Sequence, residues 1–338
     1  MKKKAAPEFC GLCPPLSRRN FLKTSSVAVA SALLPYGAVT NPLIAEEKLV
    51  PKSETLVKTL YTSLNSKQKQ AICFPYDHKL QHEVENNWFI VKKSRVGKNF
   101  NKDQQAMIHE IFMNMHSEEY AKTVLKQVED DNGRKGFGDC SIALFGEPNT
   151  GKFEFVFTGR HTTRRCDGDS EAGTAFGGPI FYGHAARSFN EKAHHPGNAY
   201  WFQAKRVNEV FQMMDGNQRK QALLDFSRNE KGKETVKLTG KKTGLEGIRM
   251  TDLTFDQKDE VRNVLDDMLA PFREVDRKES LKLIENSGFD NLHLAFFKDE
   301  DIGQDGVWDT FQIEGPNMIW LFRGDPHVHT WMHIKDSA

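Results

Sequence analysis

The part of the sequence that decides the fold lies near its end, where residues 308–334 read WDTFQIEGPNMIWLFRGDPHVHTWMHI. Two turn signals, Gly315-Pro316-Asn317 and Arg323-Gly-Asp-Pro326, separate short apolar runs in this stretch. Short apolar runs bounded by Gly, Pro and Asn are typical of antiparallel strands joined by tight turns. The stretch therefore predicts a β-meander. Its expected strands cover residues 292–297, 308–313, 318–322 and 328–334.

A hairpin is expected earlier in the chain. Residues 141–145 and 153–158 are apolar runs that flank Gly146-Glu-Pro-Asn-Thr-Gly151, a segment rich in turn residues. Residues 175–182 are a third candidate strand. Elsewhere apolar residues recur at i, i+3, i+4 and i+7, which is the spacing of a helix that buries one face. Such helices are expected at residues 57–64, 108–115, 121–128, 207–214 and 261–268.

These elements predict an α+β fold with antiparallel sheets, an N-terminal hairpin plus the C-terminal β-meander, and several packed amphipathic helices. The last helix opens with the capping-box pair Thr254 and Gln257 and is expected to stop before Pro271. Residues 231–242 are polar and basic, and we expect them to form a solvated excursion or linker. The sequence indicates no internal repeat.

The beginning of the chain predicts export. Residues 17–23 read SRRNFLK, which matches the twin-arginine motif, between the basic Lys2-Lys3-Lys4 and a weakly apolar stretch at 24–38. That stretch is shorter than the ~18 residues that an anchoring span needs. It is also broken by Pro35, so an uncleaved membrane anchor is the less favoured alternative. We expect the twin-arginine translocation machinery to be a partner.

Export would divide the chain into a signal peptide, residues 1–45, and a single α+β domain, residues 46–338. The cleavage point stays open between Ala38 and Ala45. The mature protein is expected to be periplasmic or extracellular, with no stable membrane insertion after cleavage.

The charge balance argues against nucleic acid as a partner. The chain has 47 Lys and Arg against 46 Asp and Glu. Residues 1–45 contain six basic residues and one acidic residue, so the mature chain keeps 41 basic and 45 acidic residues. A mildly acidic protein has no basic excess with which to neutralise phosphates or an anionic membrane.

The cysteines give little functional signal. Cys10 and Cys13 fall within the expected signal peptide, which leaves Cys73, Cys140 and Cys166. An odd number prevents complete pairing within the chain. A Cys140–Cys166 disulfide stays open, although small, partly buried side chains are the favoured interpretation for all three.

The histidines give the strongest signal for a site. His327 and His329 fall on one face of the last expected strand, because side chains alternate along a strand. Two imidazoles in a His-x-His pair point the same way, at a separation that suits one metal ion. His161 follows the apolar face of the strand that begins at Phe153, so we expect it to point inward. The alternatives are an exposed polar strand face and a core histidine bonded to backbone.

Further polar residues surround these positions in the sequence. His184 ends the candidate strand at 175–182 and is a candidate fourth ligand or acid–base group. Arg160, Arg164 and Arg165 are candidates for orienting an anionic substrate, with Arg165 assigned a catalytic role. His194 and His195 are expected in a solvated turn.

The chain resembles the exported bacterial "domain of unknown function 3500" family from about Val57 to His333. The resemblance implies one exported domain and points to His161, His327 and His329, which match the family pattern. Where the family usually has Gly-His-His, this chain has Gly159-Arg160-His161, and His184 has no match. Activity in that family is unassigned, so no reaction is implied. The likeness rests on residues 145–148, 159–161, 173–176, 181–183, 311–316 and 327–331.

These observations favour an exported metalloprotein. One zinc or copper ion would be held by His161, His327 and His329, with no organic cofactor. Three imidazoles and an open position suit a metal-dependent hydrolase or a copper oxidoreductase that acts on a small or anionic substrate. The alternatives are a non-catalytic periplasmic binding protein for a small anionic ligand or a metal, and a domain whose histidines are purely structural.

Overall fold

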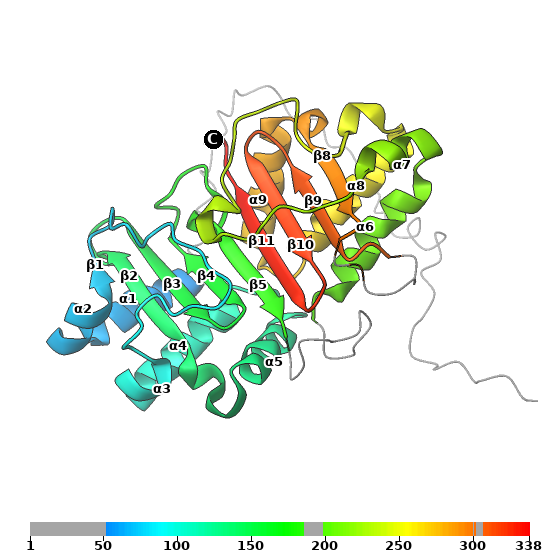
Figure 1. Ribbon diagram of the computed structural model, residues 1–338. Helices are drawn as coiled ribbons and strands as arrows, with labels where there is room; N and C mark the ends of the chain where they lie inside the picture. Colours follow the sequence, from blue (N-terminus) through cyan, green and yellow to red (C-terminus); the bar gives the residue numbers. More distant parts are fainter. Residues whose placement is uncertain (1–51, 186–198, 300, 302–306) are drawn as a thin grey trace, which may run out of the picture. The chain divides into compact units, whose positions relative to one another are not determined.

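The structure, a computed structural model, describes residues 52–185, 199–299, 301 and 307–338 (Figure 1). The expected signal peptide, its cleavage point, and His194 and His195 lie outside the described residues. In the described part, Cys73, Cys140 and Cys166 are free, and the latter two are buried.

One large sheet organises the domain. Its strands follow the order β1-β2-β3-β4-β5-β11-β10-β9-β8-β6, with β7 paired to β8 beside this path. All neighbouring strands are antiparallel except β1 with β2 and β6 with β8. The strands are β1 (Cys73–Phe74), β2 (Ser141–Gly146), β3 (Phe153–Gly159), β4 (Thr162–Cys166), β5 (Ile180–His184), β6 (Leu223–Leu224), β7 (Ile248–Arg249), β8 (His293–Phe297), β9 (Thr310–Glu314), β10 (Met318–Arg323) and β11 (Val328–Ile334).

The α+β prediction is confirmed, with one difference. The expected hairpin (β2–β3) and the meander (β8–β11) belong to a single sheet, because β5 pairs with β11 and joins them. Strand β4 was not predicted, because its sequence, TTRRC, is almost entirely polar although the strand is buried. The candidate strand at 175–182 is wrong in its first half. Ala175–Gly177 form a 3₁₀ turn in which Phe176 has φ 61°, and the strand begins only at Ile180.

All five predicted helices are present. The capping box of α8 also forms, since the Thr254 side chain accepts from the Gln257 N–H and the Gln257 side chain accepts from the Thr254 N–H. Helix α9 was missed because its buried face mixes Asp276 and Ser280 with only two apolar residues. The α-helices are α1 (Lys52–Ser63), α2 (Ser66–Ile72), α3 (Val96–Asn99), α4 (Lys102–Asn114), α5 (Ala121–Asp131), α6 (Trp201–Met213), α7 (Gly216–Ala222), α8 (Phe255–Leu269) and α9 (Glu274–Ser287).

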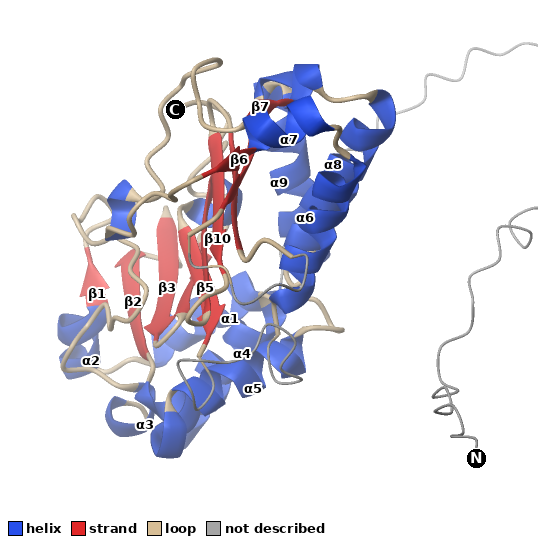
Figure 2. Ribbon diagram, turned by 45° about the vertical axis from the view of Figure 1, so that its right-hand side comes forward, coloured by secondary structure: helices blue, strands red, loops and turns tan. Residues whose placement is uncertain are grey.

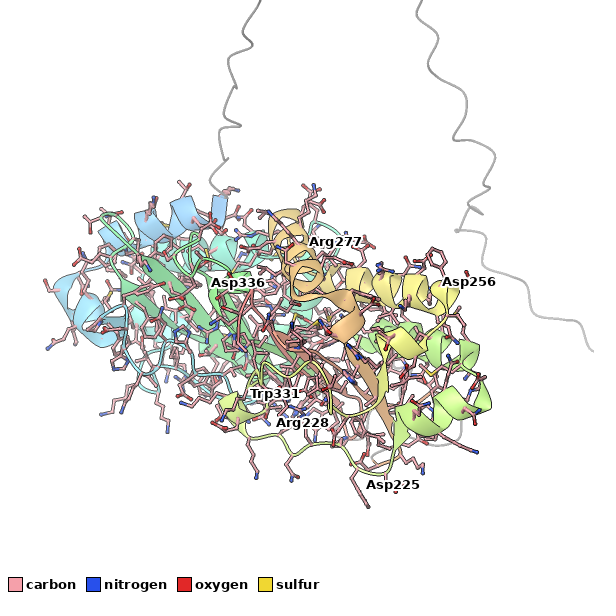
Figure 3. The ribbon with its side chains drawn as sticks, turned by 90° about the horizontal axis from the view of Figure 1, so that it is seen from above. Asp225, Arg228, Asp256, Arg277, Trp331 and Asp336 are labelled. Atoms are coloured by element: carbon pink, nitrogen blue, oxygen red, sulfur yellow. The ribbon has the colours of Figure 1, made fainter. Side chains whose placement is uncertain are left out.

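The two faces of the sheet are covered differently. The long helices pack on one face, where they share the main apolar core with residues such as Phe157 and Trp320 (Figure 2). Figure 3 shows Arg277 of α9 on this helical side, and Trp331 and Arg228 on the opposite side. Two long segments, residues 75–95 and 225–247, cover that opposite face and bury smaller apolar clusters beneath them. Residues 231–242 are therefore no free linker, because Val236 is buried against the sheet.

The two halves of the domain repeat one arrangement, which the sequence did not reveal. Each half has a helix pair, a short strand parallel to its neighbour, and four further strands: β1 to β5 in one half, and β6 and β8 to β11 in the other. Leu144 pairs with Cys73 in the first half as Phe296 pairs with Leu223 in the second. The terminal strands of the halves, β5 and β11, pair antiparallel, which is the geometry of a local two-fold axis.

Side-chain contacts follow the same repeat. Gln68 donates to the Gln104 side chain at 2.8 Å, and Gln218 donates to the Gln257 side chain at 3.0 Å. In each case both glutamines sit at the third position of a helix that opens with a capping box. The sequence did not reveal the repeat, because most equivalent apolar positions carry different residues. Ile108, Ile111 and Phe112 of α4 correspond to Val261, Val264 and Leu265 of α8.

Candidate metal centre

Three imidazoles converge where the two halves meet. The Nε2 atom of His327 lies 3.0 Å from Nε2 of His161 and 3.0 Å from Nε2 of His329. One nitrogen from each ring lies within 4.8 Å of the other two. The three side chains are buried, with exposed fractions of 3%, 8% and 5% for His161, His327 and His329. The structure thus brings together the three histidines that the sequence singled out.

Strand β11 positions two of these rings. His329 lies opposite Gly183 of β5, and His327 directly precedes the strand. The alternation expected for His-x-His therefore holds, and both rings point to the same side of the sheet.

His161 reaches the cluster by a different route from the one predicted. Strand β3 ends at Gly159, and His161 lies in the turn before β4 rather than on an extension of β3. Its φ of 54° is left-handed, a conformation that non-glycine residues seldom adopt. The His161 N–H donates to the Asn86 carbonyl at 3.0 Å, which helps to hold this turn.

Asp131 fixes the orientation of His161. Its Oδ2 lies 2.8 Å from His161 Nδ1 and also accepts from the Gln127 side chain, while Oδ1 accepts from the Ala185 N–H. Because a carboxylate only accepts, Nδ1 carries the hydrogen and Nε2 keeps its lone pair. Burial opposes ionisation of Asp131, but hydrogen bonds from His161 and His184 hold its pKa below the ordinary value.

Glu230 orients His329 in the way that Asp131 orients His161. Its Oε2 lies 2.7 Å from His329 Nδ1, and its Oε1 is paired with Arg323 Nε at 3.1 Å. The Arg323 Nη2 atom also contacts this Nδ1. A guanidinium only donates, so one ring nitrogen cannot satisfy both contacts. We assign the hydrogen bond to Glu230, because Arg323 already has the carboxylate as its acceptor. Burial opposes the ionisation of Glu230, whereas His329 and Arg323 lower its pKa.

The rings of His327 and His329 favour their neutral form. Burial, followed by neighbouring His329 and His161, lowers the pKa of His327 to about 3. Burial is also the main cause that lowers the pKa of His329 to about 4, against the opposing effect of Glu230. Neutral imidazole is the form that binds a metal ion, because the lone pair is free.

His184 lies beside the cluster rather than among the converging nitrogens. It is buried on β5, opposite Val328, and its Nδ1 is 3.4 Å from Oδ1 of Asp131. It shares that carboxylate with His161. The group of histidines with converging ligand atoms, among the described residues, is His161, His327 and His329.

The two arginines of β4, Arg164 and Arg165, form hydrogen bonds and an ion pair with other groups of the protein. The Arg165 guanidinium is buried in an ion pair with Glu154 and donates to the carbonyls of Pro179 and Glu83 at 2.6 and 2.7 Å. Burial, against the opposing effect of Arg165, raises the pKa of Glu154 to about 7. Arg164 has a similar environment of internal acceptors, with bonds to His116 Nε2 at 3.0 Å and to the Phe181 carbonyl at 2.8 Å.

Arg160 lies closer to the cluster. Its Nη1 is 3.4 Å from the backbone carbonyl of Asp131. This bond joins Arg160 to the residue whose carboxylate orients His161.

Sequence reasoning missed the two orienting carboxylates. Asp131 did leave a signal, because Gln127 and Asp131 are polar residues on the otherwise apolar, buried face of α5. A buried carboxylate at such a position requires a partner. Glu230 left no signal, since it lies in a polar segment, 99 positions from the histidine that it orients.

Fold and site together define an exported α+β protein with a buried cluster of three histidines between two similar halves. Residues 46–336 match the family described as "Protein of unknown function (DUF3500)", and the chain belongs to this family. Residues 15–35 match the signal sequence of the twin-arginine translocation pathway, so the protein is exported by that machinery. No curated protein and no solved structure matches the chain. Among the described residues, no helix has the length and apolar character that a membrane span requires.

Proposed function

We propose that this exported protein binds one zinc or copper ion through the Nε2 atoms of His161, His327 and His329. The observation that supports the proposal is that Nε2 of His327 lies 3.0 Å from Nε2 of both His161 and His329. The bonds to Asp131 and Glu230 leave lone pairs on His161 Nε2 and His329 Nε2. His327 Nε2 carries at most one hydrogen, so it can donate to only one of them. A bound cation satisfies all three lone pairs at once.

The surroundings of the three rings support a metal site as well. Ligating imidazoles usually donate their second N–H to a carboxylate, which fixes the tautomer and raises the basicity of the ligand. Asp131 and Glu230 occupy these positions at 2.8 and 2.7 Å. Imidazole suits both zinc and copper, so the ligand set leaves both ions as candidates.

We further propose a catalytic role on a small or anionic substrate. Three protein ligands leave a metal position open, as in catalytic sites, where the ion polarises a substrate or lowers the pKa of bound water to ~7. In this chain, Asp131 and Glu230 would keep Nε2 of His161 and of His329 directed at the ion. His184 would be a further acid–base group beside the site, since it shares Asp131 with His161.

Metal content tests the proposal. We would purify the exported protein and the His327→Ala/His329→Ala double variant, and measure bound elements by mass spectrometry. His333→Ala is the matched control, because His333 lies on the same strand and face but outside the cluster. We expect near-stoichiometric zinc or copper in the wild type and in the control, and little in the double variant. Absence of both metals after reconstitution would refute the proposal. A closed site without room for a further ligand would favour a binding protein over an enzyme.

A further inference from the structure

A cavity lies on the face of the sheet that residues 75–95 and 225–247 cover. It is farther along β11 than the histidine cluster. Its volume is about 390 Å³, which falls within the range of pockets that enclose small organic ligands. Pro179, Val236 and Leu238 supply apolar parts of its wall. The polar groups come from His82, His333, Thr174, three lysines (Lys233, Lys237 and Lys335) and two carboxylates (Glu171 and Glu234). An apolar wall with a few polar groups is the usual composition of a small-molecule site.

His333 presents one defined hydrogen-bonding atom to this cavity. Its Nδ1 lies 3.1 Å from the Val236 carbonyl, which only accepts, so Nδ1 carries the hydrogen. The Nε2 atom is then the ring nitrogen that remains for a ligand. Residues 231–238 therefore do more than cover the sheet, since they hold this ring and also form part of the cavity wall.

The cavity has a lysine without a counter-ion. Lys233 pairs with Glu83 at 2.6 Å and Lys237 with Glu234 at 3.9 Å. Within the described ranges, the ammonium group of Lys335 forms no ion pair, although Lys335 lines the same cavity.

Charges of both signs line the cavity, since Glu171 and Glu234 face it together with the three lysines. Burial is the main cause that lowers the pKa of His333 to about 4, and Lys335, Arg165 and His82 add to the effect. Among these charges, the Lys335 ammonium group is the one available to pair with an anionic ligand, because Lys233 and Lys237 already have carboxylate partners.

The internal repeat argues against a second metal ion at this place. The turn between β9 and β10 corresponds to the turn that holds His161. Gly159 lies four residues after Phe155 and Gly315 lies four residues after Phe311, and these two phenylalanines occupy equivalent positions in the sheet. The residue equivalent to His161 is Asn317, whose carbonyl accepts from the Lys335 N–H at 2.8 Å. This end of the β5–β11 pair thus has an asparagine where the other end has the ligand candidate His161.

We propose that this cavity binds a small organic carboxylate. Its apolar body would lie against Val236 and Leu238, and its carboxylate would pair with Lys335. A hydroxyl on the body of the ligand would donate to His333 Nε2. The site is separate from the histidine cluster and does not depend on a bound metal ion.

Benzoate and benzamide, which differ in charge but hardly in shape, test this proposal. We would titrate both into the full mature protein with a chelator present, so that failure of the metal proposal leaves the result unaffected. Binding would be followed by calorimetry and by ¹⁵N resonances of labelled histidine, with His333 assigned through its His333→Gln variant. We expect benzoate to shift the His333 resonances saturably, and benzamide to bind about tenfold more weakly because it lacks the charge.

Variants at Lys335 complete the test. Lys335→Met keeps the length of the side chain and should weaken benzoate binding about tenfold, while Lys335→Arg should restore most of it. Lys58→Met is the matched control, since Lys58 is an exposed lysine on α1 and should bind benzoate as the wild type does. Equal binding of the two probes, an unchanged affinity in Lys335→Met, or no saturable shift up to about 20 mM benzoate would each overturn the proposal.

Discussion

The Nδ1 atom of His161 lies 2.8 Å from Oδ2 of Asp131, across 30 positions of sequence. Asp131 is the last residue of α5, and His161 lies in the left-handed turn after β3. This contact ties a helix of the first half to the cluster that β11 of the second half completes. The carboxylate leaves the His161 ring one orientation, with its Nε2 facing His327.

We expect Asp131→Asn to weaken metal binding without unfolding the domain. The amide no longer carries the charge that raises the basicity of His161 and stabilises its Nδ1–H tautomer, and the loss of such a partner typically costs 10–100-fold in metal affinity. Competition with a chromophoric chelator would measure the change. Asp130→Asn is the matched control, because the adjacent Asp130 only pairs with Lys126 on the surface. Equal affinities for the two variants would show that Asp131 does not support the site.

Gly183→Ala should damage the strand pair on which the cluster depends. A Cβ atom at position 183 would lie 2.1 Å from the carbonyl oxygen of Val328, a backbone atom that cannot move aside without separating β5 from β11. We expect the free energy of unfolding to fall by at least 1–3 kcal/mol, and metal occupancy to fall with it. Chemical denaturation of the metal-free protein would measure the first effect.

Gly151→Ala provides the comparison for this prediction. Nothing lies within 4 Å of a Cβ atom at position 151, so this change should leave the unfolding free energy almost unaltered. Equal stability of Gly183→Ala and Gly151→Ala would show that the strand pair has room for a methyl group at position 183, against this prediction.

The sequence predicts the site only as far as its signals are local. The two-residue period of a strand is enough to place His327 and His329 on one side, and this placement holds in the structure. The joining of β5 to β11 was not predictable, because no local pattern specifies which strand edges meet. The partner of His329 was equally inaccessible, since Glu230 comes from a polar segment without periodicity.

Acidic pH should stabilise the contact between α1 and α9 through Asp276. Arg273 donates to Asp276 at 2.7 Å and to Glu54 at 2.7 and 3.0 Å, so one cation serves two buried carboxylates. Burial, against the opposing effect of Arg273, raises the pKa of Asp276 to about 6. The unfolded chain releases this proton near pH 4. The contribution of Asp276 is therefore fully present below about pH 4 and is lost as the pH rises to about 6.

The Asp276→Asn variant isolates this contribution, because the amide does not titrate. Between pH 4.5 and 7.5, the unfolding free energy of the wild type should fall relative to that of the variant by roughly 1–3 kcal/mol. Urea denaturation at both pH values would measure the difference. If the difference in unfolding free energy between wild type and variant did not change with pH, the pKa of Asp276 would not be raised. If the wild type instead gained stability relative to the variant as the pH rises, the effect of Arg273 would outweigh burial and the pKa of Asp276 would be lowered.

The internal repeat predicts that the same substitution at equivalent positions lowers the unfolding free energy by similar amounts. Gln68 accepts from the Asn65 N–H and donates to the Asn99 carbonyl and to Gln104. Gln218 makes the same three contacts, with Asp215, Asp252 and Gln257. Because the environments correspond, Gln68→Ala and Gln218→Ala should each lower the unfolding free energy by about 1–2 kcal/mol.

Exposed neighbours on the same two helices are the controls for this comparison. Gln70→Ala and Gln221→Ala should change the unfolding free energy by less than about 0.5 kcal/mol, because both side chains are exposed. Denaturation of the four variants under one set of conditions would test the prediction. A large cost at Gln68 with none at Gln218 would mean that the halves share an architecture but are not equally stabilised by it. A similar cost at both would show that the repeat extends from the strand order to the energetics of the helix pairs.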